Sequence, residues 1–375
     1  DDTLTPPFRM ERAGSFFRWT VDPLSGRKEP AAMTDRTSIL LASRPEGAAT
    51  ENNFRTRQDE VPEPGTGEFV VRVIWMSLDP YMRGRMDDAE SYADPVEVGD
   101  VMEAGGVGEV VASNHDGFAA GDIVTGQFGW TTHAVSDGAM VRKVDAGAAP
   151  LSAHLGVLGM PGITAWTGLN TIMGIEAGQT IVVSAATGAV GGVACQLAKA
   201  AGLRVIGVAG GAEKCAYAVD TLGCDACVDH RAAGSAKDLS REIAEAAPDG
   251  VDRYFENVGG KTLAAVLPRM NVSGRIALCG MVAWYQGRNM DEAIPLPQVW
   301  GTILKKRLRV QGFIVSDHFD DFPAFLKEVA PMLREGSVVA KEDVTEGLEN
   351  APKAFLDMLK GGNFGKTLVR VGPDP

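Results

Sequence analysis

The stretch Thr180-Ile-Val-Val-Ser-Ala-Ala-Thr-Gly-Ala-Val-Gly-Gly192 decides the fold of this chain. Its first four residues are apolar or β-branched, which predicts a buried parallel strand. Gly188 and Gly191 follow where such a strand must turn tightly, and the apolar spacing from Val190 to Ala201 is helical. A strand, a glycine turn and a helix form the fingerprint of a dinucleotide site, because bare backbone N–H groups and the helix N-terminus favour a pyrophosphate. Glycines also occur in ordinary tight turns, so the elements around this stretch must show whether it is a dinucleotide site.

The segment after Gly162 supports the dinucleotide interpretation, because predicted strands alternate there with predicted helices. We expect further strands at 203–208, 226–229, 251–257, 274–280 and 308–315, with helices at 212–222, 239–247 and 261–270. A long loop leads from the fifth strand to the sixth. This alternation predicts an α/β domain with a doubly wound parallel sheet.

The segment before Gly162 has a different pattern, with short strands between Gly and Pro residues. The strands predicted at 38–42, 68–77, 105–112 and near 123 favour an antiparallel barrel or sandwich for about residues 36 to 155. The final part has helical spacing at 322–333 and 351–359 and a strand at 366–371. We expect this part to return to the first domain.

Length and charge limit the possible functions. A chain of 375 residues suggests two domains, and its net charge of −13 argues against nucleic acid or an anionic membrane as the main partner. No apolar stretch is long enough to span a membrane. Residues 1–32 mix proline and arginine without periodicity, so we expect a disordered or non-native extension and a folded protein that begins near Met33. A transit peptide is the alternative.

Cysteine and histidine usage argues against a disulfide framework and against a metal site. Five cysteines, an odd number, all lie in the second half of the chain. Cys224 and Cys227 have CxxC spacing without a second pair, so we expect small buried thiols rather than a metal or redox pair. The first domain has no cysteine, and its histidines lack metal-ligand spacing. We therefore expect a cytoplasmic protein without zinc.

The end of the second predicted strand indicates which dinucleotide binds. An acidic residue at this point usually holds the ribose 2′-hydroxyl of NAD, but here the strand ends in Ala209-Gly-Gly-Ala212. Lys214 follows two residues later, where an ammonium group could meet a 2′-phosphate. The sequence thus favours NADP(H). NAD remains an alternative cofactor, if the side chain of Glu213 turns inward.

Without a metal, hydrogen bonds must activate the hydride acceptor. A carbon–carbon double bond conjugated to a carbonyl suits this chemistry, because a tyrosine hydroxyl can stabilise or protonate the enolate. Tyr285 follows the fifth strand at the ligand-binding edge of the sheet, and Tyr81 lies in the loop after a barrel strand. Both are candidates for catalysis. The alternative for each is a packed aromatic ring with its hydroxyl in water.

From Met33 on, the chain resembles the zinc-independent medium-chain dehydrogenase/reductases of the leukotriene B4 dehydrogenase and prostaglandin reductase type. This group includes NADP-dependent curcumin-reductase-like proteins and plant double-bond reductases. The matching motifs run nearly from end to end, and together they are highly specific. They are LDPYMRGRM at 78–86, GVGEVV at 106–111, GWTTH at 129–133, LGMPGITAWTGL at 158–169, AATGAVGG at 185–192, ENVGG at 256–260, CGMVAWYQ at 279–286, QGFIV at 311–315 and GNFGKTLV at 362–369.

The resemblance implies a GroES-like catalytic barrel from residues 33–160 and 316–375, a Rossmann NADP-binding domain from 161–315, and a cofactor in the cleft between them. It also implies a homodimer. Relatives commonly have a tyrosine beside the adenosine phosphate, where this chain has His230 followed by Arg231. The resemblance implies that the residues of this chain at the family's cofactor-binding positions are Gly188, Ala189, Val190, Gly191, Lys214, His230, Asn257, Cys279, Gly280, Met281, Val282, Tyr285, Phe313, Ile314, Val315 and Asn363.

The activity implied is NADPH-dependent reduction of the carbon–carbon double bond of α,β-unsaturated aldehydes and ketones. Tyr285 would act as proton donor or enolate stabiliser, and Tyr81 as its partner in the substrate pocket. NADPH-dependent quinone reduction is an alternative with the same cofactor. A protein that binds or senses NADPH without turnover is an alternative of another class.

Overall fold

The computed structural model describes residues 12–13, 16–17, 35–287 and 294–375. Residues 1–35 form a unit separate from the rest of the chain, in which β1 (Arg12–Ala13) and β2 (Phe16–Phe17) pair antiparallel. The disordered or non-native extension predicted for residues 1–32 lies mostly outside the described residues. The second unit comprises residues 36–375.

The second half of the chain forms a six-stranded parallel sheet with the strand order β12-β11-β10-β13-β14-β15. When these six strands are numbered by their order along the chain, their order in the sheet is 3-2-1-4-5-6. This order is typical of doubly wound dinucleotide-binding domains. Its strands are β10 (Thr180–Ser184), β11 (Arg204–Ala209), β12 (Ala226–Asp229), β13 (Val251–Glu256), β14 (Met270–Leu278) and β15 (Arg309–Gly312). The helices between them are α3 (Ala189–Ala200), α4 (Ala212–Asp220), α5 (Ala236–Ala246), α6 (Gly260–Val266) and α7 (Leu296–Lys306).

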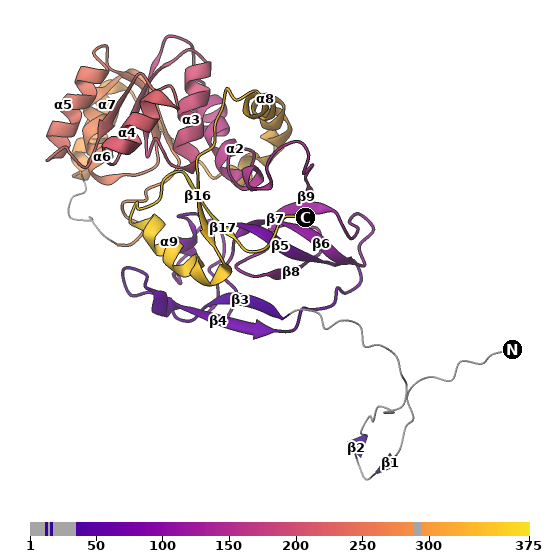
Figure 1. Cartoon of the computed structure of the whole chain (residues 1–375). Coiled ribbons are helices and arrows are strands. Elements are labelled where there is room, and N and C mark those ends of the chain that lie inside the picture. Colours follow the sequence, from indigo (N-terminus) through magenta and orange to yellow (C-terminus); the bar gives the residue numbers. More distant parts are fainter. Residues whose placement is uncertain (1–11, 14–15, 18–34, 288–293) are drawn as a thin grey trace. The chain divides into compact units, whose positions relative to one another are not determined.

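Helices cover both faces of this sheet (Figure 1). Successive side chains of a strand point to opposite faces, so Ile181 and Val183 of β10 pack in a different core from Val182. The first core includes residues of α3, of α2 (Met160–Thr167) and of α8 (Phe322–Arg334), and the second includes residues of α5 and α6. Burial on both faces explains why β10 has no polar alternation.

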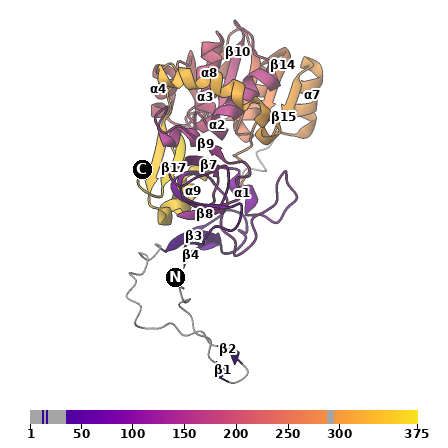
Figure 2. The ribbon, with the colours of Figure 1, turned by 90° about the vertical axis from the view of Figure 1, so that its right-hand side faces the viewer.

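Five strands from the first half of the chain and two from its end form a mixed seven-stranded sheet with the order β16-β17-β5-β6-β7-β9, in which β8 pairs with β5. Figure 2 shows α9 (Ala351–Leu359) beside these strands. Strands β3 (Arg36–Leu41) and β4 (Phe54–Asp59) form a separate antiparallel hairpin. Isolated backbone bridges join β3 to Val101 and Thr131. The strands of the seven-stranded sheet are β5 (Phe69–Ser77), β6 (Gly105–Ser113), β7 (Ile123–Gln127), β8 (His133–Ser136), β9 (Arg142–Lys143), β16 (Glu342–Glu346) and β17 (Lys366–Arg370).

An aromatic cluster at the centre of this domain joins segments that are far apart in the sequence. Trp130 stacks on Phe54 at 5.4 Å between ring centroids and meets Phe355 of α9 edge-on at 5.6 Å. Strand β17 pairs with β5. The part of the chain from Glu342 onward therefore completes a sheet that the first half of the chain begins, whereas α8 packs on α2 beside the parallel sheet.

The predicted fold class is confirmed, with corrections to single elements. The long loop predicted before the sixth strand contains α7, which begins beside two prolines that resemble loop residues but occupy the first helical turn. That strand, β15, ends at Gly312 rather than at Val315. Residues 54–59, where no strand was predicted, form β4, whose mostly polar side chains gave no apolar signal. No helix in the described part of the chain is long and apolar enough to cross a membrane.

Candidate active site

The glycine turn at the start of α3 is built for close backbone contact. Gly188 is the N-cap residue, and no side chain of the described residues caps this helix. A Cβ on Gly191 would lie 2.2 Å from the carbonyl oxygen of Ala185, so only glycine fits there. Ala185 itself has φ 49°, a conformation that a non-glycine residue rarely adopts. The first N–H groups of α3 thus have no side-chain cap and are available to bind an anion.

The strand order of the parallel sheet reverses between β10 and β13, where ligands bind in such folds. Asn257 follows β13 and bridges the two strands there. Its side-chain amide donates to the carbonyl oxygen of Ser184 at 2.8 Å, and its backbone N–H donates to the Ser184 hydroxyl at 2.8 Å. The predicted cofactor residue Asn257 therefore lies at the switch point of the sheet.

A buried carboxylate, Glu256, fixes this switch point. One of its oxygens accepts hydrogen bonds from the Ser184 hydroxyl at 2.9 Å and from the backbone N–H groups of Val258 at 2.6 Å and Gly259 at 3.0 Å. The other accepts from the Tyr254 hydroxyl at 2.7 Å. Burial raises the pKa of Glu256. Sequence reasoning missed its role, although a carboxylate at the end of a buried strand is a signal that could have found it.

Lys214 on α4 reaches the C-terminal segment. Its ammonium donates to the carbonyl oxygens of Gly361 at 3.2 Å and Asn363 at 2.5 Å. The Arg231 guanidinium also donates to Gly361, at 3.0 Å, and a backbone bridge joins Gly188 to Gly365. The structure therefore brings together predicted cofactor residues from the glycine turn, α4 and the chain end.

Four basic side chains converge near the end of β11. A Cβ on Gly210 would lie 2.8 Å from both His230 Nε2 and Arg231 Nε. The Lys261 ammonium donates to the His230 carbonyl oxygen at 2.6 Å. Burial and then the charges of Lys261 and Arg231 lower the pKa of His230. Together with Lys214, the side chains of Arg231 and Lys261 create positive charge where the ribose of a bound dinucleotide would lie, and His230 adds a neutral ring. Sequence reasoning named all but Lys261.

The loop that carries Tyr285 is fastened to the end of β13. The backbone N–H groups of Cys279 and Gly280 donate to the Glu256 carbonyl oxygen at 2.9 and 3.1 Å. Within the loop, the Met281 N–H donates to the Tyr285 hydroxyl oxygen at 3.2 Å. Burial raises the pKa of Tyr285, so its hydroxyl keeps its proton at neutral pH.

The same loop is also tied to the first domain, because the backbone N–H of Ala49 donates to the buried side chain of Gln286 at 2.9 Å. Val282, in the middle of the loop, donates to the Asn257 carbonyl oxygen at 3.2 Å. The predicted loop residues from Cys279 to Tyr285 thus lie between the switch point and the first domain.

Tyr81 lies in a cluster on the first domain, beside α1 (Met82–Arg85). The Arg85 guanidinium lies over the rings of Tyr81 and Tyr92 at 5.8 and 4.3 Å and forms an ion pair with Glu103 at 3.0 Å. Burial raises the pKa of Tyr81 well above its usual value.

Burial raises the pKa of Tyr92, and the charge of Tyr92 contributes to the raised pKa of Tyr285. Sequence reasoning gave Tyr92 no role. In the described residues no hydrogen bond joins the hydroxyls of Tyr81 and Tyr285.

The remaining predicted cofactor positions, Phe313, Ile314 and Val315, follow the end of β15 and are half-buried. A Cβ on Gly168 would lie 3.2 Å from the Phe313 ring. This segment therefore packs closely against the helical turn Gly168–Met173, which follows α2. Val315 begins a short 3-10 helix.

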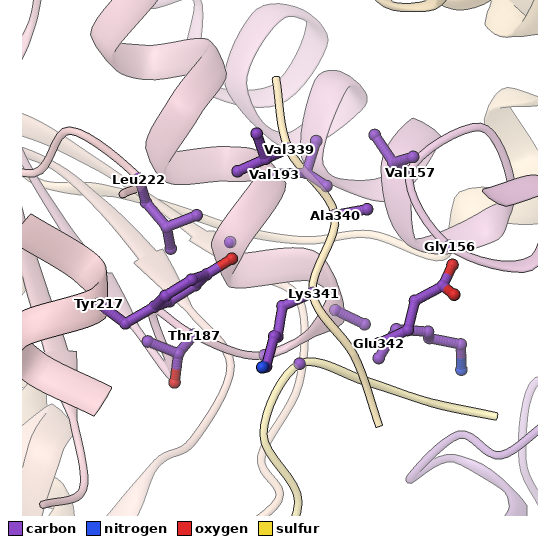
Figure 3. A pocket seen from close by; sticks show the side chains of 15 residues that line it. Gly156, Val157, Thr187, Val193, Tyr217, Leu222, Val339, Ala340, Lys341 and Glu342 are labelled. Carbon is purple, nitrogen blue, oxygen red and sulfur yellow. The ribbon is translucent and has the colours of Figure 1, made fainter. Parts of the chain in front are cut away.

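A small cavity of about 30 Å³ lies behind the glycine turn. Figure 3 shows Tyr217 and Leu222 on one side of the segment 339–342 and Val157 on the other. The cavity holds a few waters at most and is too small for a nucleotide. It separates the glycine turn from the start of β16.

The described residues offer no metal site, since no three His, Cys, Asp or Glu side chains in that part of the chain converge to hold an ion. His115, His133 and His154, which lack metal-ligand spacing in the sequence, therefore do not fit a catalytic zinc.

Comparisons with known proteins agree with this architecture. Residues 37–144 match the family described as the N-terminal domain of oxidoreductase, and residues 189–331 match zinc-binding dehydrogenase. The NADPH-dependent curcumin reductase of Escherichia coli is 46% identical over 337 residues, which are 89% of this chain and 96% of that protein. The NADP(+)-dependent 2-alkenal reductase of Nicotiana tabacum is 39% identical over 83% of this chain and 89% of its own.

Among solved structures, CurA from Vibrio vulnificus in complex with NADPH is 44% identical, with a TM-score of 0.85 over 90% of this chain and all of the other. Identity at this level over nearly the whole chain is specific to one family. The chain belongs to the zinc-independent medium-chain dehydrogenase/reductases, in the group that contains the curcumin, prostaglandin and 2-alkenal reductases.

Proposed function

We propose that this protein is an NADPH-dependent reductase of the carbon–carbon double bond of α,β-unsaturated aldehydes and ketones. The observation that carries the proposal is the position of Tyr285. Its protonated hydroxyl lies in a loop held to the switch point of the parallel sheet, and a cluster of cations lies at the end of the neighbouring strand β11. The named activities of the curcumin and 2-alkenal reductases support it.

In this proposal the chain holds NADP(H) along the ends of the parallel strands. The exposed N–H groups of Ala189, Val190 and Gly191 bind the pyrophosphate. Lys214 and His230 bind the 2′-phosphate, with Arg231 and Lys261 adding positive charge. The residues proposed to line the rest of the site are Gly188, Asn257, Cys279, Gly280, Met281, Val282, Phe313, Ile314, Val315 and Asn363.

The bound dinucleotide supplies a hydride to the β-carbon of the substrate. Negative charge then collects on the carbonyl oxygen, and the Tyr285 hydroxyl donates a hydrogen bond or its proton to that oxygen. Because burial disfavours the phenolate of Tyr285, the donor is protonated before the reaction. Tyr81 closes the substrate pocket from the first domain.

A substrate panel with alkenals, enones and quinones, each with NADPH and with NADH, tests the proposal. We expect turnover of alkenals and enones, with NADPH preferred. Activity on quinones alone would favour the quinone reductase alternative. NADPH binding with no turnover of any of the three classes would favour the sensing alternative.

We also propose that the protein is a homodimer joined at the β15 edge of the parallel sheet. Leu296, Trp300 and Leu304 recur every four residues along α7 and are 63%, 61% and 77% exposed. All four residues of β15 are exposed as well, including Val310. An apolar stripe beside an open strand edge is typical of a protein interface. Sedimentation of a Trp300→Glu variant should show a monomer, and a wild-type monomer would refute the proposal.

The domain boundaries predicted from the sequence, and the cytoplasmic location, stay predictions.

A further inference from the structure

The turn that follows β13 joins the buried Glu256 to the loop that carries Tyr285. This loop, residues 279–285, donates four backbone hydrogen bonds to carbonyl oxygens of the turn. The donor and acceptor residues, with their N–O distances, are Cys279 and Glu256 at 2.9 Å, Gly280 and Glu256 at 3.1 Å, Val282 and Asn257 at 3.2 Å, and Ala283 and Val258 at 3.0 Å. The position of the turn therefore determines the position of the loop.

Two peptide groups of this turn are held from both sides. The carbonyl oxygens of Asn257 and Val258, which accept from the loop, belong to the same peptide groups as the N–H groups of Val258 and Gly259. Those N–H groups donate to Oε1 of Glu256 at 2.6 and 3.0 Å. The N–H and C=O of a trans peptide point in opposite directions, and the described residues contain no cis peptide bond. The carboxylate therefore directs both carbonyls towards the loop, and it polarises them so that they accept more strongly.

The side chain of Glu256 is itself fixed by neighbouring strands. The Ser184 hydroxyl at the end of β10 donates to Oε1 at 2.9 Å, and the Tyr254 hydroxyl donates to Oε2 at 2.7 Å. Two of the three groups at Oε1 are backbone N–H groups, which can only donate, so this oxygen serves as an acceptor. Glu256 is fully buried. Loss of Oε1 would thus leave the N–H groups of Val258 and Gly259 without their acceptor.

The loop brings the Tyr285 hydroxyl back to the peptide groups that the turn holds. The Met281 N–H donates to this hydroxyl at 3.2 Å. A Cβ on Gly280 would lie 3.2 Å from the same hydroxyl and 3.4 Å from the Asn257 carbonyl oxygen. Gly280 also donates its N–H to Glu256. A shift of the turn would therefore move the Tyr285 hydroxyl as well.

We propose that Glu256 is a positioning residue for Tyr285, and that it acts through the turn 257–259 to hold the Tyr285 hydroxyl where the enolate oxygen forms. Glu256 neither gives nor takes a proton in the reaction. Its effect on the reaction rests on the proposed function, whereas its effect on the loop does not. The hydrogen bond from Tyr254 makes no contact with the turn, because Tyr254 packs in the core with α5 and α6.

The kinetic test measures kcat for an enone at saturating NADPH. Glu256→Met removes the acceptor and keeps an unbranched side chain of similar length. We expect kcat to fall at least tenfold or so, because a misplaced hydroxyl stabilises the enolate poorly. In a Tyr285→Phe background the same substitution should change kcat by less than about twofold, since the hydroxyl that Glu256 positions is gone. An unchanged kcat in Glu256→Met, or an equal loss in both backgrounds, would overturn the proposal.

Two further variants separate positioning from general damage to the core. Glu256→Gln keeps an oxygen at Oε1 and loses only the charge, so kcat should fall by about threefold, and only where Tyr285 is present. If Glu256→Met does not fold, this smaller loss and its absence in the Tyr285→Phe background replace it in the test. Tyr254→Phe, the matched control, should keep kcat within about twofold. A loss in Tyr254→Phe as large as that in Glu256→Met would overturn the proposal.

Hydrogen exchange of the full chain without substrate gives a readout that does not depend on turnover. The backbone amides of residues 279–285 should exchange at least tenfold or so faster in Glu256→Met, and at the wild-type rate in Tyr254→Phe. Unchanged exchange in Glu256→Met would show that Glu256 does not hold the loop. If the wild type turns over no enone, the proposed function fails, while the exchange rates still show whether Glu256 positions Tyr285.

Discussion

Acidification should destabilise this protein through one buried histidine. His154 is 8% exposed, and neither of its ring nitrogens has a hydrogen-bond partner in the described residues. Burial, and then the charge of Arg142, lower the pKa of His154 from 6.5 to about 4, while Asp145 acts in the opposite direction. The unfolded chain binds a proton below about pH 6.5, but the folded chain resists it until about pH 4. Stability is therefore lost as the pH falls through this window.

The two pKa values determine the size of this loss. Between about pH 7 and about pH 5, the difference in proton binding destabilises the folded state by about 2 kcal/mol. A His154→Leu variant removes the titrating ring and keeps an apolar side chain of similar size. The difference in stability between the wild type and this variant isolates His154, because carboxylates and other histidines titrate alike in both proteins.

Urea unfolding followed by tryptophan fluorescence measures the effect, with equal m-values for the two proteins as the control on their unfolded states. We expect the wild type to lose about 2 kcal/mol relative to His154→Leu on going from about pH 7 to about pH 5. Parallel losses in both proteins would refute the assignment of a neutral, buried ring.

Three further predictions concern the cofactor, the reaction and the core. Lys214→Met should raise the Kd for NADPH about tenfold or more and leave that for NADH nearly unchanged, by fluorescence titration; equal losses would remove Lys214 from the 2′-phosphate site. Tyr285→Phe should lower kcat for an enone by about 10²-fold to 10³-fold, while Tyr217→Phe, a hydroxyl outside the proposed reaction, keeps the rate. An undiminished rate in Tyr285→Phe would contradict the mechanism. Lys366→Met leaves the buried Asp79 without the ion pair now formed at 2.8 Å, and should destabilise the protein by about 3–5 kcal/mol in urea unfolding. Adding Asp79→Asn should restore much of this loss, and no recovery would contradict the buried-charge explanation.

Elements with a strong periodic pattern could be predicted from the sequence. The buried run at β10, the glycine turn and the helical spacing of α3 all lie within one short segment, so local signals are enough. Helix α7 was missed because prolines at its start resemble a loop, and β4 because its side chains are polar.

The site itself depends on contacts between distant residues, which local patterns do not contain. Lys214 was predicted from its place after β11, but its contact with Asn363 joins residues 149 positions apart. In the sequence, Tyr92 lies in a polar stretch without a periodic pattern. Only the structure shows that the Arg85 guanidinium lies over its ring.

The place of the chain end has a consequence for biosynthesis. Strand β17 fills the position between β16 and β5, and the residues just before it touch Lys214 and the glycine turn. A growing chain can form the parallel sheet before these residues leave the ribosome, but neither the barrel nor the nucleotide site is complete until they do. Tight binding of the dinucleotide thus requires these residues, and a product that lacks the residues from Gly361 onward would remain without this ligand's stabilisation.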